Sequence, residues 1–249
     1  MNGNSHEPSA TPWLSGSAAM VTTRWTMVLS AGAGGQTAFE AFCRTYWYPV
    51  YAFIRRQGRT PEDAQDLTQE FFARLVERNW LAGVERGEAR FSTLLLTILK
   101  NFLINAHEHA AAQKRGGGRA PLSIDQAQAE EWFGAEPVDR ETPERTFERR
   151  WALALLDAAT RRLRAEMEAA GKVRQFDELS RYLAEEPAAG DYATLAPNLG
   201  LQPNAIASAV YRLRLRLREM VLEELAGGRL VDETVEEEFR QLKAALRGA

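Results

Sequence analysis

The sequence predicts an all-α protein: two small helical domains joined by a flexible acidic linker. Apolar residues recur at helical spacing through most of the 249 residues, and β-branched runs, which favour strands, are rare. Glycine and proline are concentrated in four places, which mark the expected breaks between elements. These places are residues 32–35, 116–118, the Pro137/Pro143 region and residues 227–228.

The first half of the chain is predicted to hold three helices, over residues 39–57, 61–79 and 91–113. Pro49 should kink the first of them. Thr60 and Pro61 give the second a strong start signal, since threonine caps a helix and proline fits its first position. The buried stripe of the second helix is predicted to be Ala64, Leu67, Phe71 and Leu75, with Phe72 half exposed beside it. Helical steps in the third helix join Phe91, Leu95, Ile98 and Phe102.

The second half is predicted to hold helices over residues 147–170 and 175–184, followed by a helix-turn-helix. Asp191 is the expected N-cap of a short helix that Pro197 bends or shortens, and Gly200 makes the turn. The stretch "NAIASAVYRLRLRLREMVLEEL" (204–225) alternates leucine and arginine, which is typical of a strand. Its apolar residues nevertheless recur at helical steps, so we predict one long helix. These residues are Ile206, Val210, Leu213, Leu217 and Val221.

On this long helix, arginines lie on both sides of an outer face made of small and polar side chains. Arg212 and Arg216 fall on one flank, and Arg214 and Arg218 on the other. Such a helix suits a DNA groove, with phosphates meeting the arginines and base edges meeting the outer face. A plain solvated helix with snorkelling arginines stays open as the alternative. The predicted base-facing residues are Asn204, Ala207, Ser208 and Tyr211, with Arg212 and Arg214 anchoring phosphates.

Charge is unevenly placed along a chain whose formal net charge is −3. Residues 100–119 carry a net +3 and residues 200–218 a net +4, whereas residues 121–148 carry −6 and residues 219–249 carry −4. Two basic zones of this kind are compatible with nucleic-acid binding despite the acidic total.

Composition excludes several classes of protein and site. The single cysteine, Cys43, excludes a disulfide framework or a cysteine-based zinc site. His107 and His109 point to different helix faces, so we expect no metal and no other cofactor. We find no cluster of carboxylates or histidines suited to catalysis, and therefore expect no enzyme. Without a signal peptide or a long apolar run, the chain is expected in the cytoplasm.

With these pieces in view, the chain resembles the extracytoplasmic-function (ECF) sigma factors of the sigma-70 family of bacterial RNA polymerase initiation factors. Three blocks carry the resemblance: "FEAFCRTYWYPVYAFIRRQG" with "TPEDAQDLTQEFFARLV", then "RFSTLLLTILKNFLINAHEHAAAQKR", and "YATLAPNLGLQPNAIASAVYRLRLRLREMV". The resemblance implies sigma domain 2 (23–115), a linker (116–146) and sigma domain 4 (147–225). From the residues themselves, the N-terminus (1–22) is expected to be disordered, and the tail (226–249) is expected to form an amphipathic helix.

The resemblance also implies a role and partners: a monomer when free, which binds core RNA polymerase, directs it to promoters and opens the DNA. Asp66, Gln69, Glu70 and Arg74 would contact the polymerase, although a plain solvated face is the alternative. The loop from Asn79 to Arg90 would hold a flipped base, and the linker would thread the polymerase channel. The implied minus-ten DNA contacts are Arg90, Lys100, Asn101, Asn105, Lys114 and Arg115.

Departures from the family pattern leave alternatives open. The melting helix lacks the tryptophan that the family often has near Leu94 and His107. A helix-turn-helix repressor without polymerase contacts is the main rival, and it predicts a dimer that binds duplex DNA unaided. The tail has an apolar stripe of Leu230, Val235, Phe239, Leu242 and Leu246. It either packs on domain 4 as extra core or folds over a functional face as a regulator, in place of a separate anti-sigma factor.

Overall fold

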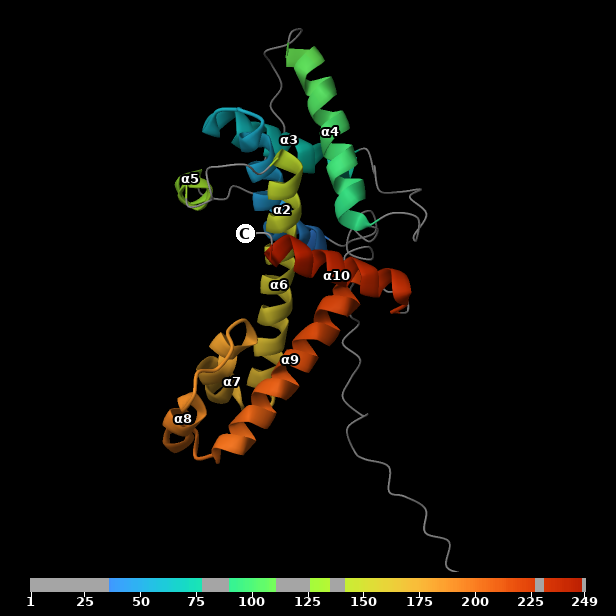
Figure 1. Ribbon diagram of the computed structural model, residues 1–249. Coiled ribbons are helices and arrows are strands. Elements are labelled where there is room, and N and C mark those ends of the chain that lie inside the picture. Colours follow the sequence, from blue (N-terminus) through green and yellow to red (C-terminus); the bar gives the residue numbers. More distant parts are fainter. Residues whose placement is uncertain (1–35, 78–89, 111–125, 135–141, 227–230, 248–249) are drawn as a thin grey trace, which may run out of the picture.

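The computed structural model describes residues 36–77, 90–110, 126–134, 142–226 and 231–247. Every regular element in these residues is a helix, which confirms the all-α prediction (Figure 1). The elements are α2 (Gln36–Arg56), α3 (Pro61–Glu77), α4 (Phe91–Ala110), α5 (Gln126–Gly134), α6 (Pro143–Ala169), α7 (Val173–Leu179), the 3₁₀ helix η2 (Ser180–Leu183), α8 (Asp191–Leu199), α9 (Pro203–Ala226) and α10 (Glu233–Arg247).

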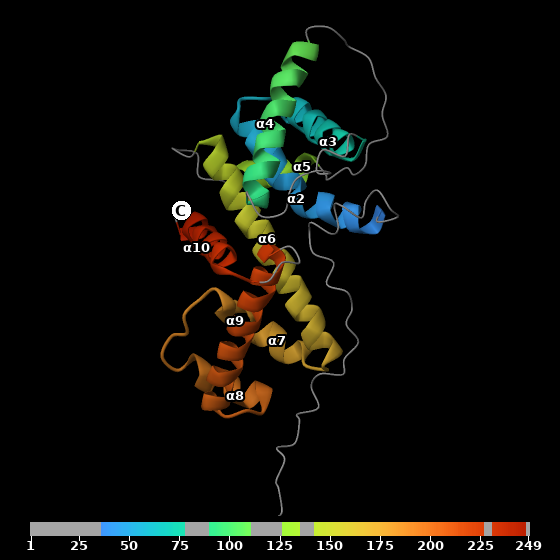
Figure 2. The same cartoon turned by 90° about the vertical axis from the view of Figure 1, so that its right-hand side faces the viewer.

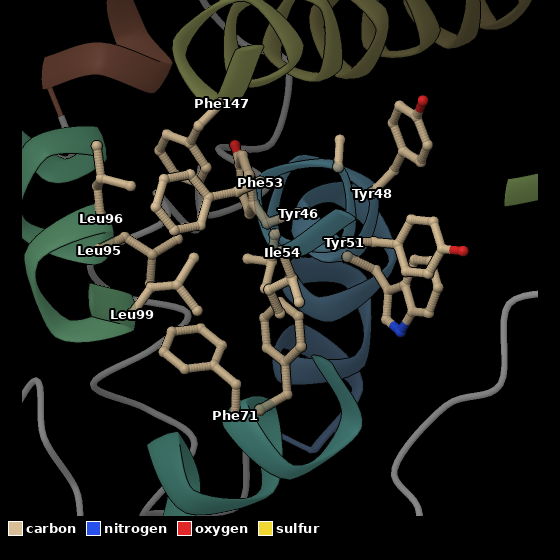
Figure 3. Packing of buried hydrophobic residues seen from close by; sticks show 14 of the residues in the cluster. Tyr46, Tyr48, Tyr51, Phe53, Ile54, Phe71, Leu95, Leu96, Leu99 and Phe147 are labelled. Carbon is tan, nitrogen blue, oxygen red and sulfur yellow. The ribbon is translucent and has the colours of Figure 1, made fainter. Parts of the chain in front are cut away.

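The first hydrophobic core surrounds α2, which α3, α4 and the first half of α6 cover. Five consecutive α2 residues, 50–54, are buried. Consecutive residues point in all directions around a helix, so α2 is the central helix of this core. Figure 3 shows Phe71 of α3, Leu99 of α4 and Phe147 of α6 directed toward the α2 side chains. Cys43 is buried in the same core.

Phe72 is only 1% exposed, so the prediction of a half-exposed ring is wrong. The ring packs edge-on against Phe71 and Phe42, with centroids 5.4 and 6.1 Å away. The cause is that α3 contacts both α2 and α4, which buries two of its faces rather than one. Of the predicted stripe, Ala64, Phe71 and Leu75 are buried, and Leu67 is partly buried against the same core.

The helix α6 runs through both halves of the molecule (Figures 1 and 2). Thr142 caps it, accepting a hydrogen bond from the Arg145 amide at 3.3 Å, and Pro143 takes the first helical position. Phe147 and Trp151 pack in the first core, and Trp151 stacks on Tyr46 with ring centroids 4.0 Å apart. The predicted domain boundary at 146/147 therefore falls inside one continuous helix.

The second core lies between the later half of α6 and the helices α7, α8, α9 and α10. Leu155, Ala159 and Leu163 continue the buried face of α6 into this core. The predicted apolar stripe of α9 faces them and is buried throughout, which confirms a helix rather than a strand over the leucine–arginine alternation. The other buried members include Phe176, Leu179, Tyr182 and Leu195.

The tail helix α10 packs against α6 and α9. Val235 and Leu242 are buried, and Phe239 and Leu246 are partly buried against their neighbours. Leu230, the first residue of the predicted stripe, lies outside the described residues. The contacts support the role of α10 as extra core, and the regulatory role stays a prediction.

A short helix, α5, lies within residues 116–146, which the sequence analysis treats as a flexible linker. Glu130 of α5 accepts hydrogen bonds from the Tyr51 hydroxyl at 2.5 Å and from the Arg55 guanidinium at 2.7 and 2.9 Å. Trp132 meets Tyr48 edge-on, and the Arg55 guanidinium lies over the Phe133 ring. These contacts attach α5 to α2, so this part of the predicted linker is a docked helix.

The attachment of α5 should weaken in acid. The hydrogen bond from Arg55 lowers the pKa of Glu130, so its contribution is present above the ordinary carboxyl pKa and is lost as pH falls through the lowered value. Glu130→Gln should cost about 1 kcal/mol at pH 7, increasing hydrogen exchange of the α5 amides about fivefold. Well below that pKa, variant and wild type should exchange alike. The exposed neighbour substitution Glu131→Gln is the control, and equal effects of both at pH 7 would contradict the assignment.

Candidate nucleic-acid interface

The helices α8 and α9 are joined by a three-residue turn over 200–202. Gly200 adopts φ 63°, in the left-handed region that glycine enters without strain. The Leu201 amide then donates to the Ala196 carbonyl at 3.2 Å, which closes the C-terminus of α8. Pro203 is the first residue of α9, a position that suits proline because it needs no backbone N–H there. The turn fixes α9 against α8 and leaves one side of α9 uncovered.

The structure tests two predictions about α8, its N-cap and the effect of Pro197. The N-cap is Gly190, at φ 94°, so the prediction of Asp191 as the cap is wrong. Asp191 is the first helical residue, and its carboxylate accepts from the Ala188 amide at 2.9 Å, which closes the preceding turn. Pro197 lies inside α8, which is short, in agreement with the prediction of a bent or shortened helix.

The outer face of α9, defined here as Asn204, Ala207, Ser208, Tyr211 and Leu215, is open to solvent. Tyr211 is 64% exposed and Leu215 is 43% exposed. Asn204 and Ser208 are exposed, and Ala207 is partly exposed. The Ser208 hydroxyl donates to the Asn204 carbonyl of its own helix at 2.9 Å, so its oxygen can still accept a hydrogen bond from a ligand. The predicted base-facing residues therefore share one exposed face, and their contact with bases stays a prediction.

The four alternating arginines of α9 have different surroundings. Arg212 is exposed. Arg216 pairs with Glu166 of α6 at 2.9 Å, and hydrogen bonding to that carboxylate raises the pKa of Arg216. Arg218 pairs with Glu236 of α10 at 2.7 Å. Two of the arginines thus join α9 to neighbouring helices, because steps of two residues on a helix point the side chains in turn to opposite sides.

Arg214 holds the segment between η2 and α8. Its guanidinium donates to the carbonyls of Tyr182 and Glu185, both at 2.8 Å, and pairs with Glu186 at 3.1 Å. A phosphate would have to compete with these partners, so the predicted phosphate contact of Arg214 needs a rearrangement that Arg212 does not need.

Arg214→Ala should therefore destabilise the second core, whereas Arg212→Ala should not. Arg214→Ala removes the hydrogen bonds from the charged guanidinium, and the two carbonyls that accepted them can then bond only to water. This loss should lower the free energy of unfolding by about 1–3 kcal/mol. Chemical denaturation followed by circular dichroism checks the difference. A smaller loss for Arg214→Ala than for Arg212→Ala would contradict the structural role of Arg214.

The predicted minus-ten residues lie on α4 and at its start. Asn101 and Asn105 are exposed, and Ile104 beside them is 61% exposed. Lys100 pairs with Glu144 of α6 at 2.8 Å, and this contact lowers the pKa of Glu144. Arg90 precedes α4 and lines a cleft of about 300 Å³ shared with α6 and α10. Lys114, Arg115 and residues 79–89 of the base-holding loop lie outside the described residues.

The sequence analysis missed Ile104 as an exposed residue because its apolar character suggests core. The spacing along α4 indicates its exposure. Ile104 lies nine residues after Leu95, which puts it on the side of the helix away from the predicted apolar stripe, and three residues after the exposed Asn101. Together Asn101, Ile104 and Asn105 form a polar and apolar patch on one face of α4.

The predicted polymerase-contact residues are brought together on α3. Asp66 and Glu70 are exposed, and Gln69 is partly exposed. Glu70 pairs with Arg74 at 2.5 Å, and the Arg74 guanidinium lies 5.5 Å from the centre of the Phe102 ring of α4. The result is an acidic surface at Asp66 and Glu70 with Arg74 held at its edge.

The described part of the chain offers no group of three or more histidine, cysteine, aspartate or glutamate side chains that could hold a metal ion. In the same residues, no helix is long and apolar enough to cross a membrane.

An exposed polar helix face behind a tight turn between helices is typical of DNA-binding helix-turn-helix proteins. The RNA polymerase sigma-H factor of Pseudomonas aeruginosa is 26% identical to this chain over 183 residues, which cover 73% of this chain and 84% of that protein. No family model matches the chain, and no solved structure matches it. This similarity supports a sigma-factor role in transcription initiation.

Proposed function

We propose that this chain is a sigma factor of the ECF type, which binds core RNA polymerase, directs it to specific promoters and helps open the DNA. The observation that carries the proposal is the similarity to a sigma-H factor over 183 residues. Because the aligned residues cover 73% of the chain, the similarity includes parts of both halves. The proposed protein is a cytoplasmic monomer when free and has no catalytic site or cofactor of its own.

The outer face of α9 supports promoter recognition. A helix with side chains is about 10–12 Å wide, and the major groove of B-DNA is about 12 Å wide. Asn204 and Ser208 lie in the first turns of α9, where helix-turn-helix proteins contact base edges. The face carries no carboxylate. A carboxylate there would repel the phosphates on either side of the helix.

Two further surfaces support the remaining steps. The acidic surface of α3 at Asp66 and Glu70 is exposed and suits a basic partner surface on the polymerase. On α4, Asn101 and Asn105 offer hydrogen bonds to unpaired bases, and Ile104 offers an apolar contact beside them. We place DNA opening at this α4 face.

The proposal is tested by run-off transcription with purified core RNA polymerase on a library of genomic promoters. The wild-type chain should produce transcripts from a defined subset of promoters, and Ser208→Ala should change the subset rather than reduce all transcripts equally. Core polymerase alone is the control. A chain that binds duplex DNA as a dimer and yields no transcript would instead be a repressor.

A further inference from the structure

The two flanks of the outer face of α9 differ in charge. On the Arg214 side, Glu185 and Glu186 are exposed, and the Glu186 side chain is 84% exposed. Arg214 already contacts both residues, one through the carbonyl and one through the carboxylate. A DNA strand on this flank would meet two carboxylates and an arginine that is already hydrogen-bonded.

The Arg212 flank opens instead into a cleft of about 280 Å³ between α6, α7 and α9. Lys172 and Arg212 line it from two different elements, and both are exposed. Its one carboxylate, that of Glu166, is held by the Arg216 guanidinium through contacts of 2.9 to 3.2 Å. Arg216 also pairs with Glu219 at 3.0 Å and Glu223 at 3.6 Å, two carboxylates outside the cleft lining. Among the lining residues themselves, Lys172, Arg212 and Arg216 face the single carboxylate of Glu166, so the lining carries a net positive charge.

The backbone fixes the position of Lys172. Gly171 turns the chain at φ 68° after α6, and the Lys172 amide donates to the Met167 carbonyl at 2.8 Å. This bond between residues five apart belongs to a common helix C-terminal motif, which closes α6 and starts α7 in a defined direction. Lys172 is thus presented from a well-anchored turn, next to the amide-bearing side chain of Gln175 in the same cleft.

Arg212 connects this cleft to the outer face, because it lies one helical turn after Ser208 on α9. When a helix lies in the major groove, the sugar–phosphate strands run along its two flanks. A phosphate at the cleft would therefore lie beside the bases that Ser208 is placed to contact.

We infer that Lys172 and Arg212 together bind one phosphate group of duplex DNA in this cleft, and that the strand on the Arg214 side receives no matching contact. The inference rests on the proposed function in taking the outer face of α9 as the DNA-binding face. It adds Lys172 as a binding residue and makes the docking of α9 asymmetric.

The test uses the full chain and a fluorescently labelled 30-base-pair duplex of mixed sequence, because phosphate contacts do not depend on sequence. Binding is followed by anisotropy over a series of KCl concentrations for wild type, Lys172→Gln, Arg212→Gln and the double variant. Lys243→Gln on α10 is the matched control, since it removes one exposed lysine charge on another helix. Unchanged far-ultraviolet circular dichroism shows that each variant is folded.

Each single substitution should make the slope of log affinity against log salt less steep. In the double variant, the magnitude of the slope should fall by about one in total. The control should keep the wild-type slope. An unchanged slope in the double variant, an equal change in Lys243→Gln, or no binding by wild type at the lowest salt would each overturn the inference.

Retention on immobilised core RNA polymerase, measured separately, distinguishes this inference from the proposed function. A chain that is retained but keeps its slope in the double variant is a polymerase partner without this phosphate site. A chain that is not retained but loses slope has the phosphate site without the sigma role.

Discussion

Reversing the charge of Asp66 and Glu70 together should abolish the retention of this chain by core RNA polymerase. Both residues are exposed on α3, so their substitution by lysine removes no core contact. The change turns two negative charges into two positive ones on a surface that we propose faces a basic partner, and such like-charge contacts cost several kcal/mol. A loss of that size lowers the affinity for core RNA polymerase more than a hundredfold, so no retained chain should be detected in a pull-down.

A second pair of acidic residues on α10 provides the matched control. Glu233 and Glu237 are also four residues apart, and Glu237 pairs with an arginine of its own helix just as Glu70 does. Lysine at both positions should leave retention intact. If the α3 variant is retained with normal helical circular dichroism, α3 is not the docking surface, and the repressor alternative gains support.

Trp151→Ala should cause the largest loss of stability among the substitutions considered. The side chain is 5% exposed, stacks on Tyr46 and lies within 6.0 Å of the Phe147 ring by centroid distance. Replacing a buried aromatic ring by a methyl group leaves a cavity, which typically costs about 3–5 kcal/mol. For a chain of this size, Tm should fall by about 10 °C in a thermal melt.

Trp132→Ala on α5 is the control for Trp151→Ala, because Trp132 is 41% exposed and should cost far less. Comparable losses for the two tryptophans would contradict the packing of α6 in the first core. Separate unfolding of two halves in wild type would also contradict it, since α6 shares residues with both cores.

Much of the fold follows from local patterns in the sequence. The helix start at Thr60 and Pro61 and the apolar stripe of α9 are present as predicted. The start of α6 carries the same threonine–proline signal at Thr142 and Pro143, but the sequence analysis placed it at residue 147.

The features that the sequence did not reveal depend on partners far along the chain. α5 is too short to be stable alone, and its contacts with α2 join residues 75 and 79 positions apart. The distinction between Arg212 and Arg214 likewise depends on acceptors 28 to 32 residues before Arg214. Local spacing placed both arginines on the flanks of α9 but could not assign their partners.

The continuity of α6 has a consequence for promoter architecture under the proposed function. Its 27 residues make a rod about 40 Å long, which holds the α4 face and the outer face of α9 at a set separation. Adding one base pair between two DNA elements shifts them by about 3.4 Å and rotates them by roughly 35°. Tilting α6 to follow such a change would disturb the packing of Phe147 and Trp151 in the first core. The proposed sigma factor would therefore require one spacer length between the two promoter elements. It would bind promoters with a longer or shorter spacer poorly, even when both elements match.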